Sequence, residues 1–99
     1  MKEEFNIAIV GVGGIGSNLV SLIVPSLSQG RLSQKYNMIN INLYDSDKVE
    51  EENIFHQRFN HSNIDETKVL ATKKNLKSFE SDKLQIIPNE KDVREIKDI

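Results

Sequence analysis

Three stretches of this chain have the apolar pattern of strands. Phe5 to Val10 is a nearly continuous apolar run with only Asn6 interrupting it, as in a buried parallel strand. Met38 to Tyr44 alternates isoleucine or leucine with asparagine or tyrosine, which indicates a strand with one face better buried than the other. Leu84 to Ile87 is a shorter apolar run, ended by a proline and an asparagine. The pattern therefore predicts three strands.

A helix is predicted between the first two strands. Apolar residues recur there at i, i+4, i+7 and i+8, and we expect the stripe that they form to face the sheet. The stripe consists of Ile15, Leu19, Leu22 and Ile23, and it is widened by Val20, Val24 and Leu27. Pro25 lacks a backbone N–H and clashes with the preceding turn, so we expect the helix to kink or end near Val24 and to be over by Ser28.

A second helix is predicted between the second and third strands. Ser62 to Asp65 offers residues that cap a helix N-terminus, and a helical spacing follows. The spaced positions are Val69, Thr72, Leu76 and Phe79. Gln29 to Asn37 has no periodicity and is expected to be a loop, whereas Asp92 to Ile99 begins a further helix-like pattern.

This alternation of strands and helices indicates an α/β fold, with a Rossmann-like parallel sheet and flanking helices. About three strands and two to three helices fit into the 99 residues. Such a sheet is incomplete, because a three-stranded version leaves an apolar edge unpaired. We therefore expect residues 1–99 to be a fragment or a truncated domain.

The glycines after the first strand follow the spacing of a phosphate-binding turn. Gly11, Gly13 and Gly16 fit the pattern G-x-G-x-x-G. The first glycine permits a sharp turn, the second lets the backbone approach a phosphate, and the third lets the helix pack on the strand. The helix N-terminus would then face an anion. A plain strand-to-helix connection is the alternative, since such turns also occur without a ligand.

Two charged residues favour a nucleotide site. Asp45 follows the second strand, where an acidic residue can accept hydrogen bonds from a ribose hydroxyl; an aspartate-rich turn with Asp47 is the alternative. Lys68 falls in the first turn of the second helix, where the macrodipole disfavours a cation, and this cost favours a role such as binding a phosphate. An ordinary exposed lysine is the alternative.

The connection from Asn53 to Phe59 interleaves aromatic, amide, imidazole and guanidinium groups. Such a segment either lines a pocket or seals the rim of the core with Ile54, Phe55 and Phe59, and the sequence does not decide between the two. The carboxylates at Glu50 to Glu52 are interpreted as a solvated loop and not as a metal site.

Composition narrows the choice of partners. The net charge of -2 lacks the basic footprint of nucleic-acid or anionic-membrane binding. The absence of cysteine excludes a disulfide, a thiolate zinc site and a cysteine nucleophile within these residues. The N-terminus lacks a secretory pattern, and the most apolar stretch, Leu19 to Leu27, is too short to span a bilayer. A cytoplasmic location is therefore expected.

The motifs form an ordered series. It runs from Gly-Val-Gly-Gly-Ile-Gly-Ser at 11–17, through Tyr-Asp-Ser-Asp-Lys-Val at 44–49, to Asn53 with Gln57 and finally to Lys68. In order and spacing this series resembles the ThiF, MoeB and ubiquitin-activating enzymes, which adenylate the C-terminal carboxylate of a ubiquitin-like or sulfur-carrier protein. The resemblance covers nearly the whole chain, as the N-terminal part of the family's nucleotide-binding domain.

The resemblance implies roles for single residues. The ATP phosphate loop would consist of Gly11, Gly13, Gly14 and Gly16, with Asp45 on the ribose and with Asn53 and Lys68 on the triphosphate. His56 occupies the position of the family's arginine, next to the motif residue Gln57, and lacks an arginine's bidentate fork. Arg58 is the alternative cation, and with Lys68 it is a candidate catalytic residue. The glycine usual before the family's lysine is also absent, with Asp65 near its place.

The resemblance further implies a magnesium ion, whose aspartate ligand is expected beyond Ile99, and a carrier protein ending in Gly-Gly as partner. It also implies a homodimer in a complete domain, and we expect the 99 residues alone to be inactive. Two other functions stay open. A domain binding the cofactor of an NAD(P)-dependent oxidoreductase would explain the glycines and Asp45 but not Asn53, Gln57 and Lys68. A non-catalytic Rossmann-like module that binds protein is the third possibility.

Overall fold

Three parallel strands form one sheet in the order β1-β2-β3. In the computed structural model, which describes residues 3–30, 32–55 and 57–99, the strands are β1 (Glu4–Val10), β2 (Met38–Tyr44) and β3 (Leu84–Asn89). Ile41 of β2 lies opposite Ile7 of β1 and Ile86 of β3. The predicted α/β class with its parallel sheet is confirmed.

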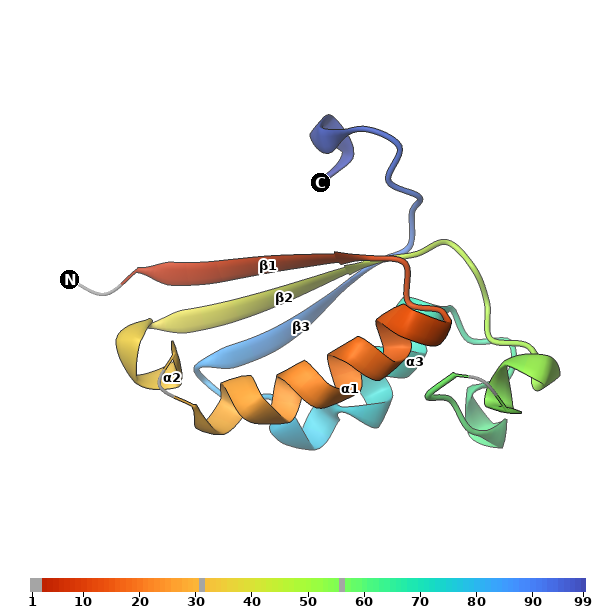
Figure 1. The fold of residues 1–99 in the computed structure, drawn as a ribbon, viewed down its shortest axis with the longest axis horizontal. Helices are drawn as coiled ribbons and strands as arrows, with labels where there is room; N and C mark the ends of the chain where they lie inside the picture. Colours follow the sequence, from red (N-terminus) through yellow and green to blue (C-terminus); the bar gives the residue numbers. More distant parts are fainter. Residues whose placement is uncertain (1–2, 31, 56) are drawn as a thin grey trace.

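The longer helices, α1 (Gly14–Gln29) and α3 (Lys68–Asn75), lie against one face of the sheet, and the C-terminal segment leaves on the other side (Figure 1). The short helix α2 (Leu32–Lys35) lies inside the predicted loop, so that prediction is wrong for these residues. Within the described residues, no helix combines the length and the apolar character that crossing a membrane requires.

The core lies between β2 and the two longer helices. Ile39, Ile41 and Leu43 of the central strand are fully buried, as their alternation predicts. The other buried core residues are Ile9, Val12, Val20, Val24, Val49, Phe59, Val69, Ala71, Leu84 and Ile86. Phe59 therefore seals the core, whereas the side chain of Phe55 is outside the described part of the chain.

The apolar stripe predicted for α1 does not face the sheet but is largely exposed to solvent. Ile15, Leu19 and Leu22 are 87%, 44% and 67% exposed, whereas the buried residues of this helix are Ser17, Val20 and Val24. The reason is Gly16, where a Cβ would lie only 1.9 Å from the carbonyl oxygen of Gly11. This close approach turns position 16 toward the glycine turn and thereby fixes which side of α1 meets the sheet.

Pro25 does not end α1, so the helix does not stop near Val24; it continues to Gln29, one residue past the predicted limit at Ser28. Val24 is fully buried, and Leu27 packs against the core. Burial of these side chains on both sides of the proline offsets the hydrogen bond that Pro25 cannot make.

The second predicted helix begins later and is shorter than its pattern suggested. Thr67 caps α3, and Ser62 to Asp65 do not: they overlap and follow a 3-10 helix, His61–Asn63, whose cap is Asn60. Leu76 and Phe79 pack against the core after α3 has ended.

The C-terminal part also differs from its prediction. β3 extends through Pro88, which pairs opposite Leu43, because a proline is tolerated in an edge strand. Within Asp92 to Ile99 the helical residues are Ile96–Asp98, which form a single 3-10 turn.

Candidate functional site

The glycine turn joins β1 to α1 at the carboxyl end of the sheet. Gly11 has φ +87°, a left-handed conformation that suits glycine, and its N–H donates to the carbonyl of Tyr44 at 2.8 Å. Gly13 follows, and α1 begins at Gly14. A helix N-terminus therefore opens directly after the turn, as the glycine spacing predicts.

Asp45 lies beside this turn and binds it. Its Oδ2 accepts a hydrogen bond from the N–H of Val12 at 2.8 Å, and its Oδ1 accepts one from the N–H of Asp47 at 2.8 Å. The carboxylate thus joins the glycine turn to the turn that follows β2. Because each carboxylate oxygen has two lone pairs, both can still accept a further hydrogen bond from a hydroxyl.

A cavity of about 400 Å³ adjoins Asp45. Its lining consists of Val10, Gly11, Tyr44, Asp45, Asp47, Asp92, Val93 and Arg94. The sequence analysis did not identify residues 92–94 as part of a site. The position of Asp92 to Arg94 just after β3 was the available signal, since ligands of open α/β sheets bind beyond the carboxyl ends of the strands.

Lys68 lies in a second, polar cavity of about 190 Å³. Its lining consists of Asp47, Lys48, Glu50, Asn53 and Lys68. The residue is 8% exposed, and its ammonium Nζ lies 3.8 Å from Oδ2 of Asp47. Its backbone N–H also donates to the carbonyl of Asp47 at 2.8 Å. The structure therefore brings Asn53 and Lys68 together, with the Asp47 carboxylate as the present neighbour of the ammonium.

Acidic groups moderate the charge of this polar cavity. The side chain of Asp47 is 71% exposed, so it can move away from Lys68 when another anion enters. Glu52 raises the pKa of Glu50 through a hydrogen bond and through its charge. In the described part of the chain, no group of three or more histidine, cysteine, aspartate or glutamate residues is arranged to hold a metal ion.

Gln57 and Arg58 lie on the α1 side of the site. A Cβ on Gly13 would meet the carboxamide of Gln57 at 3.9 Å, and Oε1 of Gln57 is a buried oxygen that has no hydrogen-bond partner among the described residues. Arg58 donates from Nε to Oδ1 of Asn18 at 2.6 Å and does not line the cavity of Lys68. His56, the other candidate at this position, lies outside the described residues.

A residue with a strained backbone lies shortly before Lys68 in the sequence. Asp65 has φ 72°, the one left-handed non-glycine residue in the described chain. Its N–H donates to the carbonyl of Val49 at 3.0 Å, and the N–H of Val49 donates to Glu66 at 2.8 Å. Asp65 therefore occupies a position that favours glycine, three residues before Lys68.

These features define a Rossmann-like α/β domain with a glycine turn, an acidic residue after the second strand and a buried lysine. The sequence profile of the ThiF family matches residues 2–98, and the chain belongs to this family. A search of curated protein sequences finds no match.

Solved structures share the fold. E. coli MccB with ATP is 24% identical over 95% of this chain and 25% of its own, with a TM-score of 0.67. PaaA is 21% identical over 90% of this chain and 24% of its own, with a TM-score of 0.70. The microcin C7 biosynthetic enzyme MccB in complex with N-formylated MccA is 25% identical, with a TM-score of 0.61. The chain thus spans about a quarter of the length of these proteins.

Proposed function

We propose that this chain is the ATP-binding part of an adenylating enzyme, which joins AMP to the C-terminal carboxylate of a peptide or protein. The observation that carries the proposal is the shared cavity of Lys68 and Asn53, which meets the cavity of Asp45 and the glycine turn at Asp47. A cation, an amide and a helix N-terminus along one continuous surface suit a triphosphate.

In this proposal the nucleotide extends across the carboxyl edge of the sheet. The adenine and ribose occupy the cavity of about 400 Å³, with Asp45 accepting a hydrogen bond from a ribose hydroxyl and Val93 contacting the base. The triphosphate lies over Gly13 and Gly14 and reaches Asn53 and Lys68. Its arrival displaces the Asp47 carboxylate from the ammonium of Lys68.

Adenylation requires a carboxylate oxygen to attack the α-phosphorus while the bond to pyrophosphate breaks. Both reactants are anions, so the chain's contribution is to neutralise charge and to align the reacting atoms. Lys68 and the backbone N–H groups at the start of α1 serve that purpose. Among the residues that the structure describes, no group of three or more histidine, cysteine, aspartate or glutamate side chains is arranged to hold a metal ion, and none of these contributions depends on one.

The substrate that we propose is a ubiquitin-like or sulfur-carrier protein ending in Gly-Gly, and we propose that the active assembly is a homodimer in the cytoplasm. Membership of the ThiF family supports the carboxylate chemistry. A short peptide is the second candidate, because MccB has been solved in complex with N-formylated MccA. Incubation of a chain that extends beyond Ile99 with ATP, magnesium and either substrate, followed by mass spectrometry, should reveal an acyl-adenylate, whereas residues 1–99 alone should give none. A carrier or peptide amidated at its C-terminus is the matched control.

The nucleotide itself separates the proposal from its rivals. Calorimetric titrations with ATP and NADH should give tighter binding of ATP. Tighter binding of NADH would instead support an oxidoreductase cofactor domain, and no binding of either would support a protein-binding module.

A further inference from the structure

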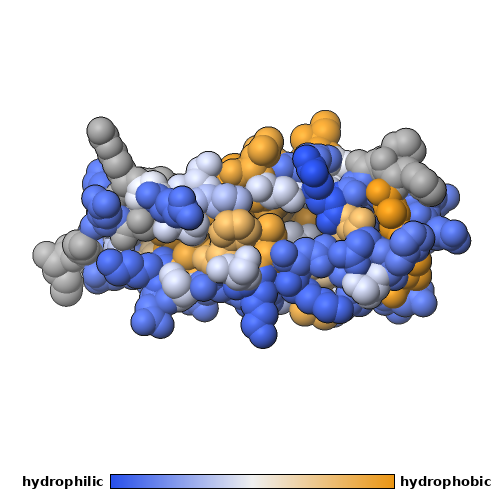
Figure 2. All heavy atoms as spheres, turned by 90° about the horizontal axis from the view of Figure 1, so that it is seen from below, coloured by the Kyte–Doolittle hydropathy of each residue, from blue (hydrophilic) through white to orange (hydrophobic). Residues whose placement is uncertain are grey.

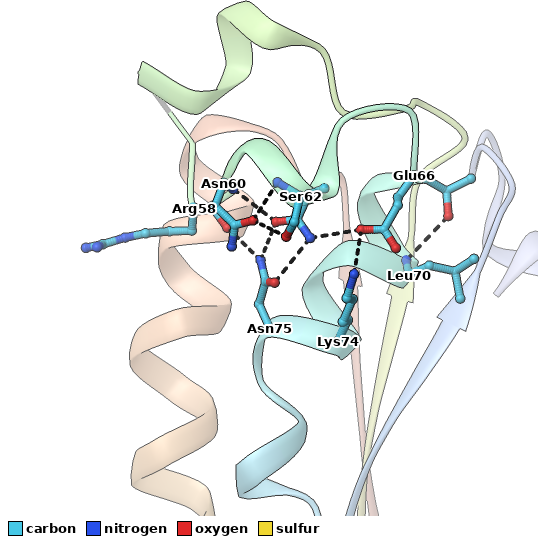
Figure 3. Close-up of polar contacts among 9 residues, drawn as sticks. Arg58, Asn60, Ser62, Glu66, Leu70, Lys74 and Asn75 are labelled. Carbon is cyan, nitrogen blue, oxygen red and sulfur yellow. Dashed lines mark hydrogen bonds and ion pairs between the residues drawn. The ribbon is translucent and has the colours of Figure 1, made fainter.

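The side chains of Asn63, in the segment before Lys68, and Asn75, an exposed residue at the end of α3, form a reciprocal amide pair. Figure 3 shows Asn75 among the polar contacts of this segment. Nδ2 of Asn75, in the last turn of α3, donates to Oδ1 of Asn63 at 2.8 Å, and Nδ2 of Asn63 donates back to Oδ1 of Asn75 at 3.2 Å. Asn63 is fully buried. The pair therefore links the segment before α3 to the end of that helix.

Asn63 uses its complete hydrogen-bonding capacity at this point. Besides the bonds to Asn75, its Oδ1 accepts from the N–H of Asn60 at 3.0 Å, and its Nδ2 donates to Oε1 of Glu66 at 2.9 Å. Asn75 also donates to the carbonyl of Arg58 at 3.4 Å. Because both donors and both lone pairs of a buried amide are engaged, removing one partner leaves a costly unpaired group.

The segment held by this pair runs from the α1 side of the site to the Lys68 cavity. At its start, the N–H of Arg58 donates to Oγ of Ser17 in α1 at 3.1 Å. At its end, the N–H of Lys68 donates to the carbonyl of Asp47 at 2.8 Å. These anchors lie on different elements, and the amide pair sits between them.

We propose that Asn63 and Asn75 are positioning residues, which hold the segment between its anchor on Ser17 of α1 and Lys68, so that Lys68 keeps a fixed position relative to the N-terminus of α1 for binding a triphosphate. This inference rests on the proposed ATP site. Neither asparagine lines the cavities of Lys68 or Asp45, so their effect on binding is exerted through the residues that they hold in place.

Asn75→Ala tests the proposal, with Val24→Ala as a control for stability because Val24 lies in the core, distant in sequence from the segment. We expect Asn75→Ala to raise the Kd for ATP about tenfold and Val24→Ala to change it less than twofold. In the absence of ATP, hydrogen exchange of the Arg58 and Lys68 amides should accelerate relative to that of Ile41 in Asn75→Ala only. In Asn75→Asp the side chain can still accept a hydrogen bond from Nδ2 of Asn63. This variant should therefore give intermediate values of the Kd for ATP and of the relative exchange rate.

Two results for Asn75→Ala together would overturn the positioning role: a Kd for ATP equal to that of the unaltered protein, and exchange of the Arg58 and Lys68 amides that is unchanged relative to that of Ile41. A purely structural loss would accelerate the exchange of all three amides together. If the unaltered protein binds no ATP, the proposed function fails, and the exchange ratios alone then decide whether the pair orders the segment. Unequal exchange would support that ordering even in this case.

Discussion

Asp65, three residues before Lys68, has a strained backbone conformation. Its φ of 72° lies in the left-handed region, where an L-residue with a branched side chain is disfavoured by about 1–2 kcal/mol. Aspartate tolerates this region better than most residues because its short side chain can hydrogen-bond locally. The strained position precedes a candidate functional lysine, as strained backbone often does.

Replacing Asp65 tests this assignment. We expect Asp65→Gly to unfold at an equal or higher urea concentration, and Asp65→Val to lose about 1–2 kcal/mol of stability because its Cβ is branched. Asp82, an exposed residue with an ordinary backbone, is the matched position for the same two changes. A valine tolerated equally at both positions would contradict the strained geometry.

Gly16 is a second residue whose effect can be measured. A Cβ there would meet the Gly11 carbonyl at 1.9 Å, whereas a Cβ on Gly13 would have an ordinary contact at 3.9 Å. We expect Gly16→Ala to lower the free energy of unfolding by about 3 kcal/mol or more, and Gly13→Ala to change it by less than about 1 kcal/mol. Thermal unfolding of the two variants checks this, and equal midpoints would contradict the account of how α1 is oriented.

Gly11, Asp45 and Lys68 lie at strand and helix ends as the sequence indicated, because local backbone rules determine such positions, and their roles toward a ligand stay predictions. It did not predict residues 92–94, because their place in the cavity of Asp45 depends on how the chain turns after β3. The partner of Arg58 was equally unpredictable, since Asn18 is 40 residues away in sequence.

At the scale of elements, a charged cluster joins the end of α3 to β3. Nζ of Lys73 donates to Oε1 of Glu80 and to the carbonyl of Ile86, each at 2.7 Å. Oε1 of Glu80 also accepts from the N–H of Ile86 at 2.8 Å. The side chain of Glu80 is only 19% exposed. This cluster closes the crossover from the helix back to the sheet.

The cluster makes stability depend on pH. Burial alone would raise the pKa of Glu80, but hydrogen bonds from Lys73 and from the Ile86 N–H outweigh it and lower the pKa below the usual 4.5. Glu80 therefore stabilises the fold above pH 4.5, and this contribution disappears as the pH falls through the lowered value. We expect Glu80→Gln to be less stable than the unaltered chain at pH 7 and to lose less stability on acidification. Urea unfolding at pH 7 and pH 3 measures this, with Glu51→Gln as an exposed control.

The elements themselves were mostly predictable, and the face of α1 was not. Helical spacing in α1 allows more than one apolar stripe, because Ile15, Leu19 and Leu22 alternate with Val20 and Val24. The choice between them depends on the tertiary contact of Gly16 with the glycine turn. Periodicity predicts that a helix exists but does not select between two overlapping faces.

At the scale of the whole molecule, apolar surface accumulates along the outer side of α1 and the free edge of β1. Ile15, Leu22 and Val10 are 87%, 67% and 53% exposed, and apolar side chains show on the helix-covered side in Figure 2. A groove of about 730 Å³ lies next to Val10 and Ile15 and includes the glycine turn in its lining. Large apolar surfaces of this kind favour association.

We therefore expect the chain to self-associate as its concentration rises. Ile15→Ser combined with Leu22→Ser should shift sedimentation toward the monomer and lower the binding of a hydrophobic dye, without a large change in unfolding temperature. Ser26→Ala, on an exposed position of the same helix, is the control. Unaltered sedimentation of the double variant would contradict this assignment of the apolar surface.

The face of the sheet that carries Asn40 and Asn42 can be compared with the prediction made from the alternation of β2. The sequence predicted a less buried face carrying Asn40 and Asn42. In the structure Asn40 donates to Asn6 at 2.9 Å and accepts from Gln85 at 3.0 Å, which forms a row of amides across all three strands. Sequence could predict the face but not the row, because the register of three separate strands aligns these residues.

In the proposed ATP site, Lys68 is the side chain that binds the phosphates. Calorimetry of ATP binding to the unaltered chain, Lys68→Ala and Lys77→Ala tests it most directly, since Lys77 is an exposed lysine that follows α3 and lines neither cavity. We expect Lys68→Ala to raise the Kd by about tenfold or more, because a charge-assisted contact is lost, and Lys77→Ala to leave it within twofold. Equal affinity of Lys68→Ala and the unaltered chain, with both folded, would contradict the claim.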